Sequence, residues 1–281
     1  MKAKMGIRVH QFLSFSKIFN SINLAPKAHK TKYLFFPGCS LLAYEPQITG
    51  WILDHLQEKL DMEVGSILKC CGKPTKNLGM DKTFKRRFDQ LKKEIEGTGA
   101  EYIVVTCQSC LEIFEKHWNK NVISLWELFP KLGLPKNSEG KGKESKVVFN
   151  IHDSCSGREK KEVHDGIRWI LKELGYNVEE LENSREKTVC CGAGSLSVHG
   201  NYEVSQKIMK RRAEESTTGH MISYCSACRE SLEIGGADSI HILELIFGDV
   251  YSTESMNKRN ISVLKRWMNR FKSKVELKKR R

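Results

Sequence analysis

The ten cysteines of this 281-residue chain form two sets of five that share one internal order. Each set begins with a single cysteine, continues with an adjacent pair followed by glycine, and ends in a Cys-x-x-Cys motif. Spacers of 30 and 35 residues separate these parts in the first set, and spacers of 34 and 33 in the second. The first set is Cys39, Cys70, Cys71, Cys107 and Cys110; the second is Cys155, Cys190, Cys191, Cys225 and Cys228. Because the two sets use every cysteine, they indicate shared chemistry rather than packing.

The sequence between the cysteines repeats as well. "ITGWILDHL" (48–56) corresponds to "GIRWILKEL" (166–174), which places Trp51 opposite Trp169 in segments of helical spacing. We expect both tryptophans to be core anchors. The period is about 117 residues, so the chain is a duplication of one unit.

Apolar and polar patterns predict the same elements in both halves. Short apolar runs, "KYLFF" and "KVVFNI", lead to Cys39 and Cys155, and "EYIVVT" and "HMISY" lead to Cys107 and Cys225; these are predicted strands. The segments after the Cys-Cys pairs, "DKTFKRRFDQLKKEIEG" and "NYEVSQKIMKRRAEE", are predicted to be amphipathic helices. Alternating strands and helices indicate an α/β fold with a parallel sheet in each half.

The duplication divides the chain into five predicted segments. Residues 133–146 are rich in Gly, Lys and Ser and are the predicted linker. The segments are a basic N-terminal extension (1–32), a first cysteine-rich domain (33–132), the linker (133–146), a second cysteine-rich domain (147–250) and a basic amphipathic C-terminal helix (251–281).

The charge of the chain is concentrated at its two ends. Of the net +13, residues 1–32 carry +7 and residues 258–281 carry +10, which leaves −4 for the body between them. A body without a basic excess argues against nucleic acid as the partner.

The basic ends also carry apolar residues at helical spacing. In the tail these residues are Ile261, Leu264, Met268, Phe271 and Val275, and a weaker stripe lies in the N-terminal extension. Basic helical extensions with apolar stripes either dock on an anionic membrane surface or an acidic partner, or pack on the body of the protein. With no apolar run long enough to span a bilayer and no signal-peptide pattern, we expect a cytoplasmic protein with optional peripheral membrane association.

Ten cysteines in such a chain favour metal ligation or redox chemistry over a disulfide framework. A structural zinc ion and a cubane [4Fe–4S] cluster each take four ligands, whereas each half of this chain offers five. The fifth thiolate is a spare, a bridging ligand or a redox-active group. Adjacent cysteines reach one cluster only if the backbone bends around it, and Gly72 and Gly192 permit such a bend.

The cysteine pattern resembles that of the CCG cysteine-rich domain family over residues 33–248, and "FFPGCS" and "HDSCSG" match the family's surroundings of the first cysteine. The best-known member is the catalytic B subunit of heterodisulfide reductase, and relatives include iron–sulfur subunits of glycolate and lactate oxidation complexes. The resemblance implies two non-cubane [4Fe–4S] clusters, one held by each five-cysteine set. In the reductase, the cluster irons bind the sulfurs of a disulfide and cleave it with one electron from each cluster.

The resemblance implies a disulfide- or thiol-linked oxidoreductase subunit, and both motifs are complete, unlike those of several lactate and glycolate subunits. The chain lacks the C-x2-C-x2-C-x3-C-P run of ferredoxins, so electrons are expected from a ferredoxin-like or flavin-containing partner. Two alternatives stay open: an electron-transfer subunit of a hydroxy-acid dehydrogenase complex, and a zinc-binding scaffold.

His152 stands three residues before Cys155. It is the candidate catalytic residue, as a proton donor to a leaving thiolate. The alternative is a structural histidine that orients the loop.

Overall fold

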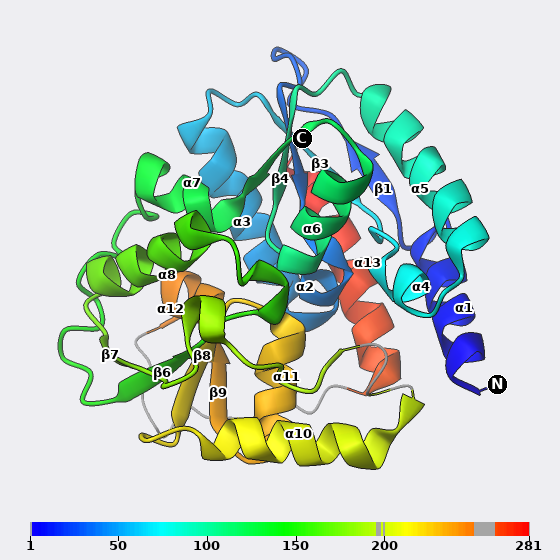
Figure 1. Ribbon diagram of the computed structural model, residues 1–281. Coiled ribbons are helices and arrows are strands. Elements are labelled where there is room, and N and C mark those ends of the chain that lie inside the picture. Colours follow the sequence, from blue (N-terminus) through cyan, green and yellow to red (C-terminus); the bar gives the residue numbers. More distant parts are fainter. Residues whose placement is uncertain (1, 195–197, 199, 250–261, 281) are drawn as a thin grey trace. The chain divides into compact units, whose positions relative to one another are not determined.

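Two β-sheets organise the computed structural model, which describes residues 2–194, 198, 200–249 and 262–280 (Figure 1). The chain divides into a first unit of Met1–Ser124 with Ile261–Arg281 and a second unit of Leu125–Asn260. Each unit contains one of the sheets and one of the five-cysteine sets. The α/β fold with a sheet in each half, expected from the duplication, is confirmed.

The sheet of the first unit has the order β1-β3-β2-β4-β5, in which β1 is antiparallel to β3 and the other strands are parallel. The predicted strands before Cys39 and Cys107 are β2 and β4. The strands are β1 (Ser21–Asn23), β2 (Tyr33–Phe36), β3 (Val64–Leu68), β4 (Tyr102–Val105) and β5 (Asn121–Ser124).

Helix α5 (Asp81–Glu96) of the first unit buries its apolar stripe. In α5, Phe84, Phe88, Leu91 and Ile95 are spaced four, three and four apart, and they pack in the core with β2 and β4 residues. The other helices of this unit are α1 (Lys2–Ser14), α2 (Gly38–Tyr44), α3 (Pro46–Lys59), α4 (Lys73–Asn77), α6 (Gln108–His117) and α13 (Val263–Lys279).

The sheet of the second unit is entirely parallel, with the order β7-β6-β8-β9. This order repeats β3-β2-β4-β5 of the first sheet, strand for strand, as a duplication requires. The strands are β6 (Val148–His152), β7 (Asn177–Glu180), β8 (His220–Ser223) and β9 (Asp238–His241). The helical elements are α7 (Leu125–Leu132), η1 (Cys155–Gly157), α8 (Lys161–Leu174), η2 (Arg185–Lys187), α10 (Tyr202–Glu214), α11 (Ser226–Gly235) and α12 (Ile242–Phe247).

The predicted linker residues hydrogen-bond to helices of the second unit. The backbone N–H groups of Gly140 and Gly142 donate to the last turn of α8, at 2.8 and 2.7 Å. The Ser138 hydroxyl donates to the Ile246 carbonyl of α12 at 2.9 Å. The domain boundaries proposed from the sequence stay a prediction.

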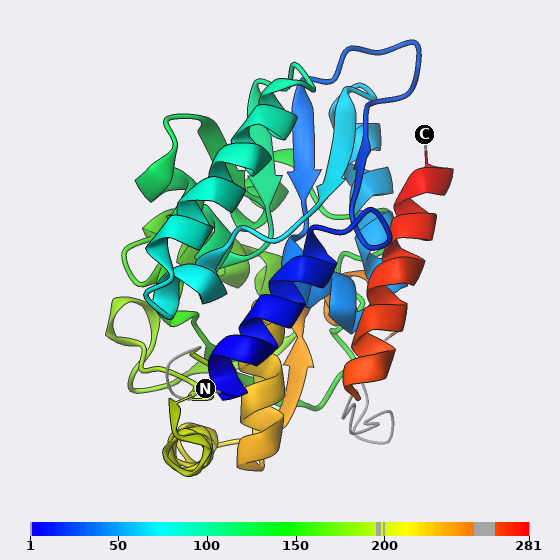
Figure 2. The same ribbon diagram turned by 90° about the vertical axis from the view of Figure 1, so that its right-hand side faces the viewer.

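The N-terminal basic extension contains a strand as well as a helix. It forms α1 and then the edge strand β1, which the sequence did not predict because three residues give no alternation to recognise. At the other end, α13 packs against α2 and α3 (Figure 2). Residues 251–261 of the predicted C-terminal helix lie outside the described residues.

The expectation that both repeat tryptophans anchor the core is wrong. Trp51 is 36% exposed and Trp169 is partly exposed, whereas Trp126 of α7 is fully buried. Among the described helices, none has the length and apolar composition of a membrane span.

Candidate iron–sulfur sites

The first cysteine set lies where strands of the first sheet end and helices begin. Cys39 is in the first turn of α2, directly after β2, and Cys70 and Cys71 lie between β3 and α4. Cys107 is the N-cap of α6 and Cys110 is in its first turn. The carboxyl ends of parallel strands meet at one edge of a sheet, so the fold gathers these five residues.

The second set follows the same plan. Cys155 begins η1 after β6, and Cys190 and Cys191 follow η2. Cys225 is the N-cap of α11, with Cys228 in its first turn. All ten cysteines of the two sets are free thiols, as a ligand role requires.

In the first set, the sulfurs form an unbroken series of contacts. The Cys39 thiol hydrogen-bonds with Cys70, and Cys70 with Cys71. Cys71 then contacts Cys110, and Cys110 contacts Cys107. All five sulfurs therefore belong to one cluster of side chains.

The second set repeats this series in the same order. Cys155 contacts Cys190, and Cys190 contacts Cys191. The Sγ atoms of Cys191 and Cys228 are 3.2 Å apart, and Cys228 contacts Cys225. The duplication seen in the sequence is thus preserved in the side-chain contacts of both sites.

Neighbouring thiols shift each other's pKa in opposite directions. The Cys70 thiol, together with burial, raises the pKa of Cys39 to about 12, whereas Cys110 lowers the pKa of Cys71 to about 6. In the second set Cys155 lowers the pKa of Cys190 to about 2. The pKa values of the adjacent Cys39 and Cys70 are both raised to about 12, because neighbouring buried thiolates repel. Five thiolates fit here only with cations among them, which is what a metal cluster supplies.

A glycine follows each Cys-Cys pair in the left-handed conformation, with φ of 88° at Gly72 and 85° at Gly192. The backbone N–H groups of these glycines donate to the sulfurs of Cys70 and Cys190, at 3.4 and 3.3 Å. A Cβ atom at Gly192 would lie 2.9 Å from the Ser205 carbonyl oxygen. Both glycines therefore allow the tight turn predicted for the pair.

A buried carboxylate, Asp153, connects the segments of the second site. Arg168 donates two hydrogen bonds to it, at 2.7 and 2.8 Å, and the backbone N–H of Arg185 donates a third at 2.7 Å. The Tyr224 hydroxyl lies 3.3 Å from Oδ1, and the Thr188 hydroxyl donates to the Asp153 carbonyl at 2.8 Å. Burial raises the pKa of Asp153, but Arg168 and the Arg185 N–H outweigh it, so the net pKa is lowered.

This network touches every part of the second set. Asp153 precedes Cys155, Arg185 and Thr188 precede the Cys-Cys pair, and Tyr224 precedes Cys225. The first site has Pro37 in place of Asp153, and there the Thr106 hydroxyl donates to the Pro37 carbonyl at 2.7 Å. The two sites therefore have the same arrangement of five sulfurs, but different side chains connect the segments that carry the cysteines.

His152, the candidate proton donor, is fully buried at the end of β6. Arg212 Nε donates to its Nδ1 at 2.9 Å, so a neutral ring carries its hydrogen on Nε2. Burial, and then Arg212, lowers the pKa of His152 to about 3. One ring nitrogen and the sulfurs of Cys191 and Cys228 lie within 4.8 Å of one another. The geometry suits a hydrogen-bond donor to sulfur, and the proton-donor role stays a prediction.

Sequence reasoning missed two residues of α1. His10 lies with Cys39 and Cys70 in a group whose ligand atoms are within 4.8 Å of one another, and Gln11 Nε2 donates to the Cys70 sulfur at 3.2 Å. Neither residue stands in a motif, because only tertiary packing brings α1 to the cysteines.

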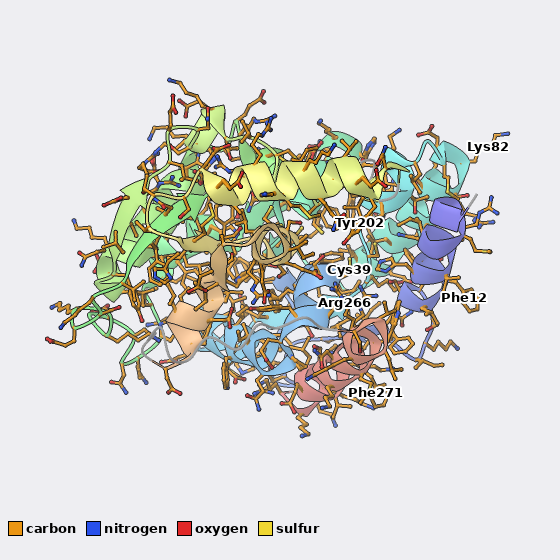
Figure 3. All side chains as sticks on the ribbon, turned by 90° about the horizontal axis from the view of Figure 1, so that it is seen from below. Phe12, Cys39, Lys82, Tyr202, Arg266 and Phe271 are labelled. Carbon is orange, nitrogen blue, oxygen red and sulfur yellow. The ribbon has the colours of Figure 1, made fainter. Side chains whose placement is uncertain are left out.

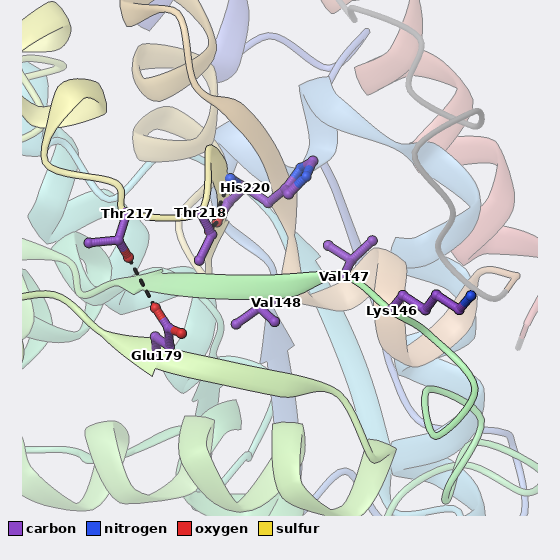
Figure 4. A pocket seen from close by; sticks show the side chains of 7 residues that line it. All are labelled: Lys146, Val147, Val148, Glu179, Thr217, Thr218 and His220. Atoms are coloured by element: carbon purple, nitrogen blue, oxygen red, sulfur yellow. Dashed lines mark hydrogen bonds between the residues drawn. The ribbon is translucent and has the colours of Figure 1, made fainter.

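An open depression on the second unit is separate from the cysteines (Figure 4). Its lining comprises residues 146–148, Glu179, Thr217, Thr218 and His220. These residues include the amino-terminal ends of β6 and β8, whereas the cysteines follow the carboxyl ends. Thr217 and Glu179 hydrogen-bond to each other at 3.1 Å within this lining, and no cysteine is among the lining residues, so the depression is not part of the candidate site.

Comparison with known families assigns both cysteine sets to one domain type. The CCG cysteine-rich domain matches residues 33–115 and 149–233. All ten cysteines lie inside these two ranges.

Three curated relatives illustrate the range of proteins that share these domains. The EtfAB:quinone oxidoreductase of Syntrophomonas wolfei is 29% identical over 62% of this chain and 26% of its own length. A dihydromethanophenazine:CoB–CoM heterodisulfide reductase subunit of Methanosarcina acetivorans is 21% identical over 76% of this chain and 56% of its own length. FadF of Bacillus subtilis is named a probable iron-sulfur-binding oxidoreductase. It is 35% identical over 32% of this chain and 13% of its own length.

The chain thus spans between 13% and 56% of the length of these relatives. The two matched segments together cover more than half of the chain, and they coincide with the two sets of sulfur contacts. This chain belongs to the CCG cysteine-rich domain family.

Proposed function

We propose that this chain is an iron–sulfur oxidoreductase subunit that reduces or forms a disulfide or thiol-linked substrate at two non-cubane [4Fe–4S] clusters. The observation that carries the proposal is the pair of five-sulfur series with identical order of contacts. Zinc would use four sulfurs and leave one thiol in each series without a role, which makes the zinc scaffold the weaker alternative. The name of the B. subtilis relative, an iron-sulfur-binding oxidoreductase, supports iron over zinc.

The ten cysteines would hold the clusters, five to each. When bound, the clusters would supply the two electrons that convert a disulfide and two protons into two thiols. The polypeptide fixes the sulfur positions through the Gly72 and Gly192 turns and through the helix starts at Cys107 and Cys225. His152 would donate its ring N–H to the second sulfur series, because one of its ring nitrogens lies within 4.8 Å of the Cys191 and Cys228 sulfurs.

The electrons would come from a ferredoxin-like or flavin-containing partner. The heterodisulfide reductase relative is itself named as a subunit, and this chain spans just over half of it, at 56%. The matched segments contain cysteines only for the two CCG sets, so a further electron carrier belongs to another polypeptide or domain.

The proposal is tested by metal analysis and EPR of anaerobically purified protein. We expect about eight irons per chain, as two four-iron clusters require, and little zinc. Addition of bis(2-hydroxyethyl) disulfide to a partly reduced sample should produce a new paramagnetic signal, and so should addition of 2-mercaptoethanol to an oxidised sample. Two zinc ions per chain would overturn the iron assignment.

A plain electron-transfer role is the second candidate. The S. wolfei relative is named for EtfAB and a quinone, neither of which is a disulfide. In that case the iron content is the same, but the EPR spectrum does not respond to disulfide or thiol. The single experiment therefore separates the two functions.

We also propose that α1 and α13 dock the chain on an anionic membrane surface. Both helices leave large apolar side chains exposed; Phe12 is 70% exposed, Leu264 73% and Phe271 48% (Figure 3). The predicted stripe of α13 therefore faces away from the protein, while the polar side chains of Asn269 and Ser273 are buried against α2 carbonyls.

The two helices adjoin and share their basic character. Lys274 Nζ donates to the Lys17 carbonyl at 2.6 Å, and the rings of His10 and Trp267 are 5.7 Å apart. Exposed basic residues flank the apolar ones, and residues 1–32 contain no acid. Apolar side chains with surrounding Lys and Arg suit insertion among anionic headgroups.

Vesicle flotation tests the docking proposal. The protein should float with vesicles of phosphatidylcholine and phosphatidylglycerol, and not with phosphatidylcholine alone. Joint substitution Phe12→Glu and Phe271→Glu should weaken binding by roughly tenfold or more, since two apolar contacts are lost. Val204→Glu, at an exposed apolar position of α10, is the matched control. Failure of the wild type to float would leave an acidic partner subunit as the occupant.

A further inference from the structure

Helix α1 lies outside the segment that matches the CCG family, yet it reaches the first sulfur series. The family match begins at residue 33, whereas α1 ends at Ser14. Gln11, only 1% exposed, donates from Nε2 to the Cys70 sulfur at 3.2 Å. Arg87 donates to the Gln11 Oε1 at 2.9 Å, which orients the amide so that its NH2 group points at the sulfur.

His10, the neighbour of Gln11, brings an imidazole to the same sulfurs. One of its ring nitrogens and the sulfurs of Cys39 and Cys70 lie within 4.8 Å of one another. Arg270 Nη1 lies 3.4 Å from Nδ1 and Ser14 Oγ lies 3.4 Å from Nε2, and Arg270 Nε donates to the Cys39 carbonyl at 3.3 Å. The second site also has a histidine beside two sulfurs, but there His152 lies with Cys191 and Cys228, which correspond to Cys71 and Cys110, and Arg212 donates to the histidine.

The two histidines come from different secondary-structure elements, since His10 lies in α1 and His152 in β6. His152 is the last residue of β6, three residues before Cys155. The corresponding residue of the first unit is Phe36, the last of β2 and three residues before Cys39. A phenyl ring has no N–H, so the first strand cannot supply what the second one does.

We propose that α1 completes the first iron–sulfur site, with Gln11 and His10 directed at the sulfurs of Cys39 and Cys70. This inference rests on the proposed iron–sulfur cluster in the first cysteine set. Hydrogen bonds to cluster sulfurs stabilise the more negative, reduced form and raise the reduction potential. Helix α1 thereby sets the potential of the first cluster independently of the second, where His152 lies beside a different pair of sulfurs, Cys191 and Cys228.

The test replaces each donor in the full-length chain and follows both clusters by EPR-monitored redox titration. Gln11→Leu and His10→Phe should leave iron content unchanged and shift one of the two potentials to lower values, further in the double variant. His152→Phe should shift the other potential, which assigns each cluster to its set. Val9→Ala, at an exposed position of α1, is the matched control and should shift neither.

A second measurement covers loss of the cluster. If His10→Phe loses the iron of one site, His10→Asn, which retains an N–H donor, should restore it. With 15N-histidine, pulsed EPR should show a nitrogen coupling that His10→Phe removes. Unchanged potentials at normal iron content, or an equal shift in Val9→Ala, would overturn the role of α1 while leaving the proposed function intact. Absence of iron from the wild type would instead overturn the proposed function.

Discussion

Replacing Cys191 with serine is expected to lower the iron content of anaerobically purified protein from about eight atoms per chain to about four. Cys191 stands in the middle of its sulfur series, in contact with Cys190 and, at 3.2 Å, with Cys228. A serine hydroxyl is a poor ligand for soft iron, so the series is cut into two parts. Total iron, acid-labile sulfide and the visible absorption spectrum measure the loss.

Controls for this variant come from the duplication itself. Cys71→Ser, at the corresponding position of the first set, should remove the other half of the iron, and the double variant should contain almost none. Ser226→Ala, between Cys225 and Cys228, should keep all of it. Normal iron in Cys191→Ser would contradict ligation by all five sulfurs and would reduce Cys191 to a spare thiol.

The order of the cysteines and the apolar runs before them predicted the α/β class and four of the nine strands in the described part of the chain. β2, β4, β6 and β8 stand where the runs are, because a buried central strand must be apolar on both faces. β7 was not predicted, since all four of its residues are exposed and it has no apolar run. β7 is placed in the sheet by its pairing with β6, and this pairing cannot be predicted from the local sequence.

Of the residues at the two sulfur sites, the sequence predicted those that belong to the cysteine motifs. The ten cysteines could be assigned to two sites from their spacing alone, because the same order of five occurs twice. His10 lies 29 positions from Cys39 and on another element, so no spacing rule connects them. Asp153 adjoins a cysteine motif, but its partners Arg168 and Tyr224 are identified only by the folded chain.

Replacing Asp153 with asparagine is expected to destabilise the second unit by about 1.5–3 kcal/mol and to release its cluster. The Asp153 side chain is fully buried and Arg168 is 14% exposed, so the substitution removes the buried carboxylate from the guanidinium and leaves it only Glu180, which is 44% exposed, as an ion-pair partner. The amide also cannot accept all the hydrogen bonds that Arg168, the Arg185 N–H and Tyr224 direct at Asp153. Thermal unfolding and hydrogen exchange measure the stability, and iron analysis measures the cluster.

Asp165→Asn is the matched control because Asp165 also accepts from an arginine, Arg185, but is 43% exposed. Exposed ion pairs contribute less than about 1 kcal/mol, so this variant should unfold close to the wild type and keep its iron. In Asp153→Asn, faster hydrogen exchange should appear in the segments before Cys155, Cys190 and Cys225, because Asp153 connects these three. Equal stability and equal iron in the two variants would show that the sulfurs of the second set are held without the Asp153 network. Loss of iron in Asp153→Asn alone, with the first cluster retained, would show that the network positions the second set.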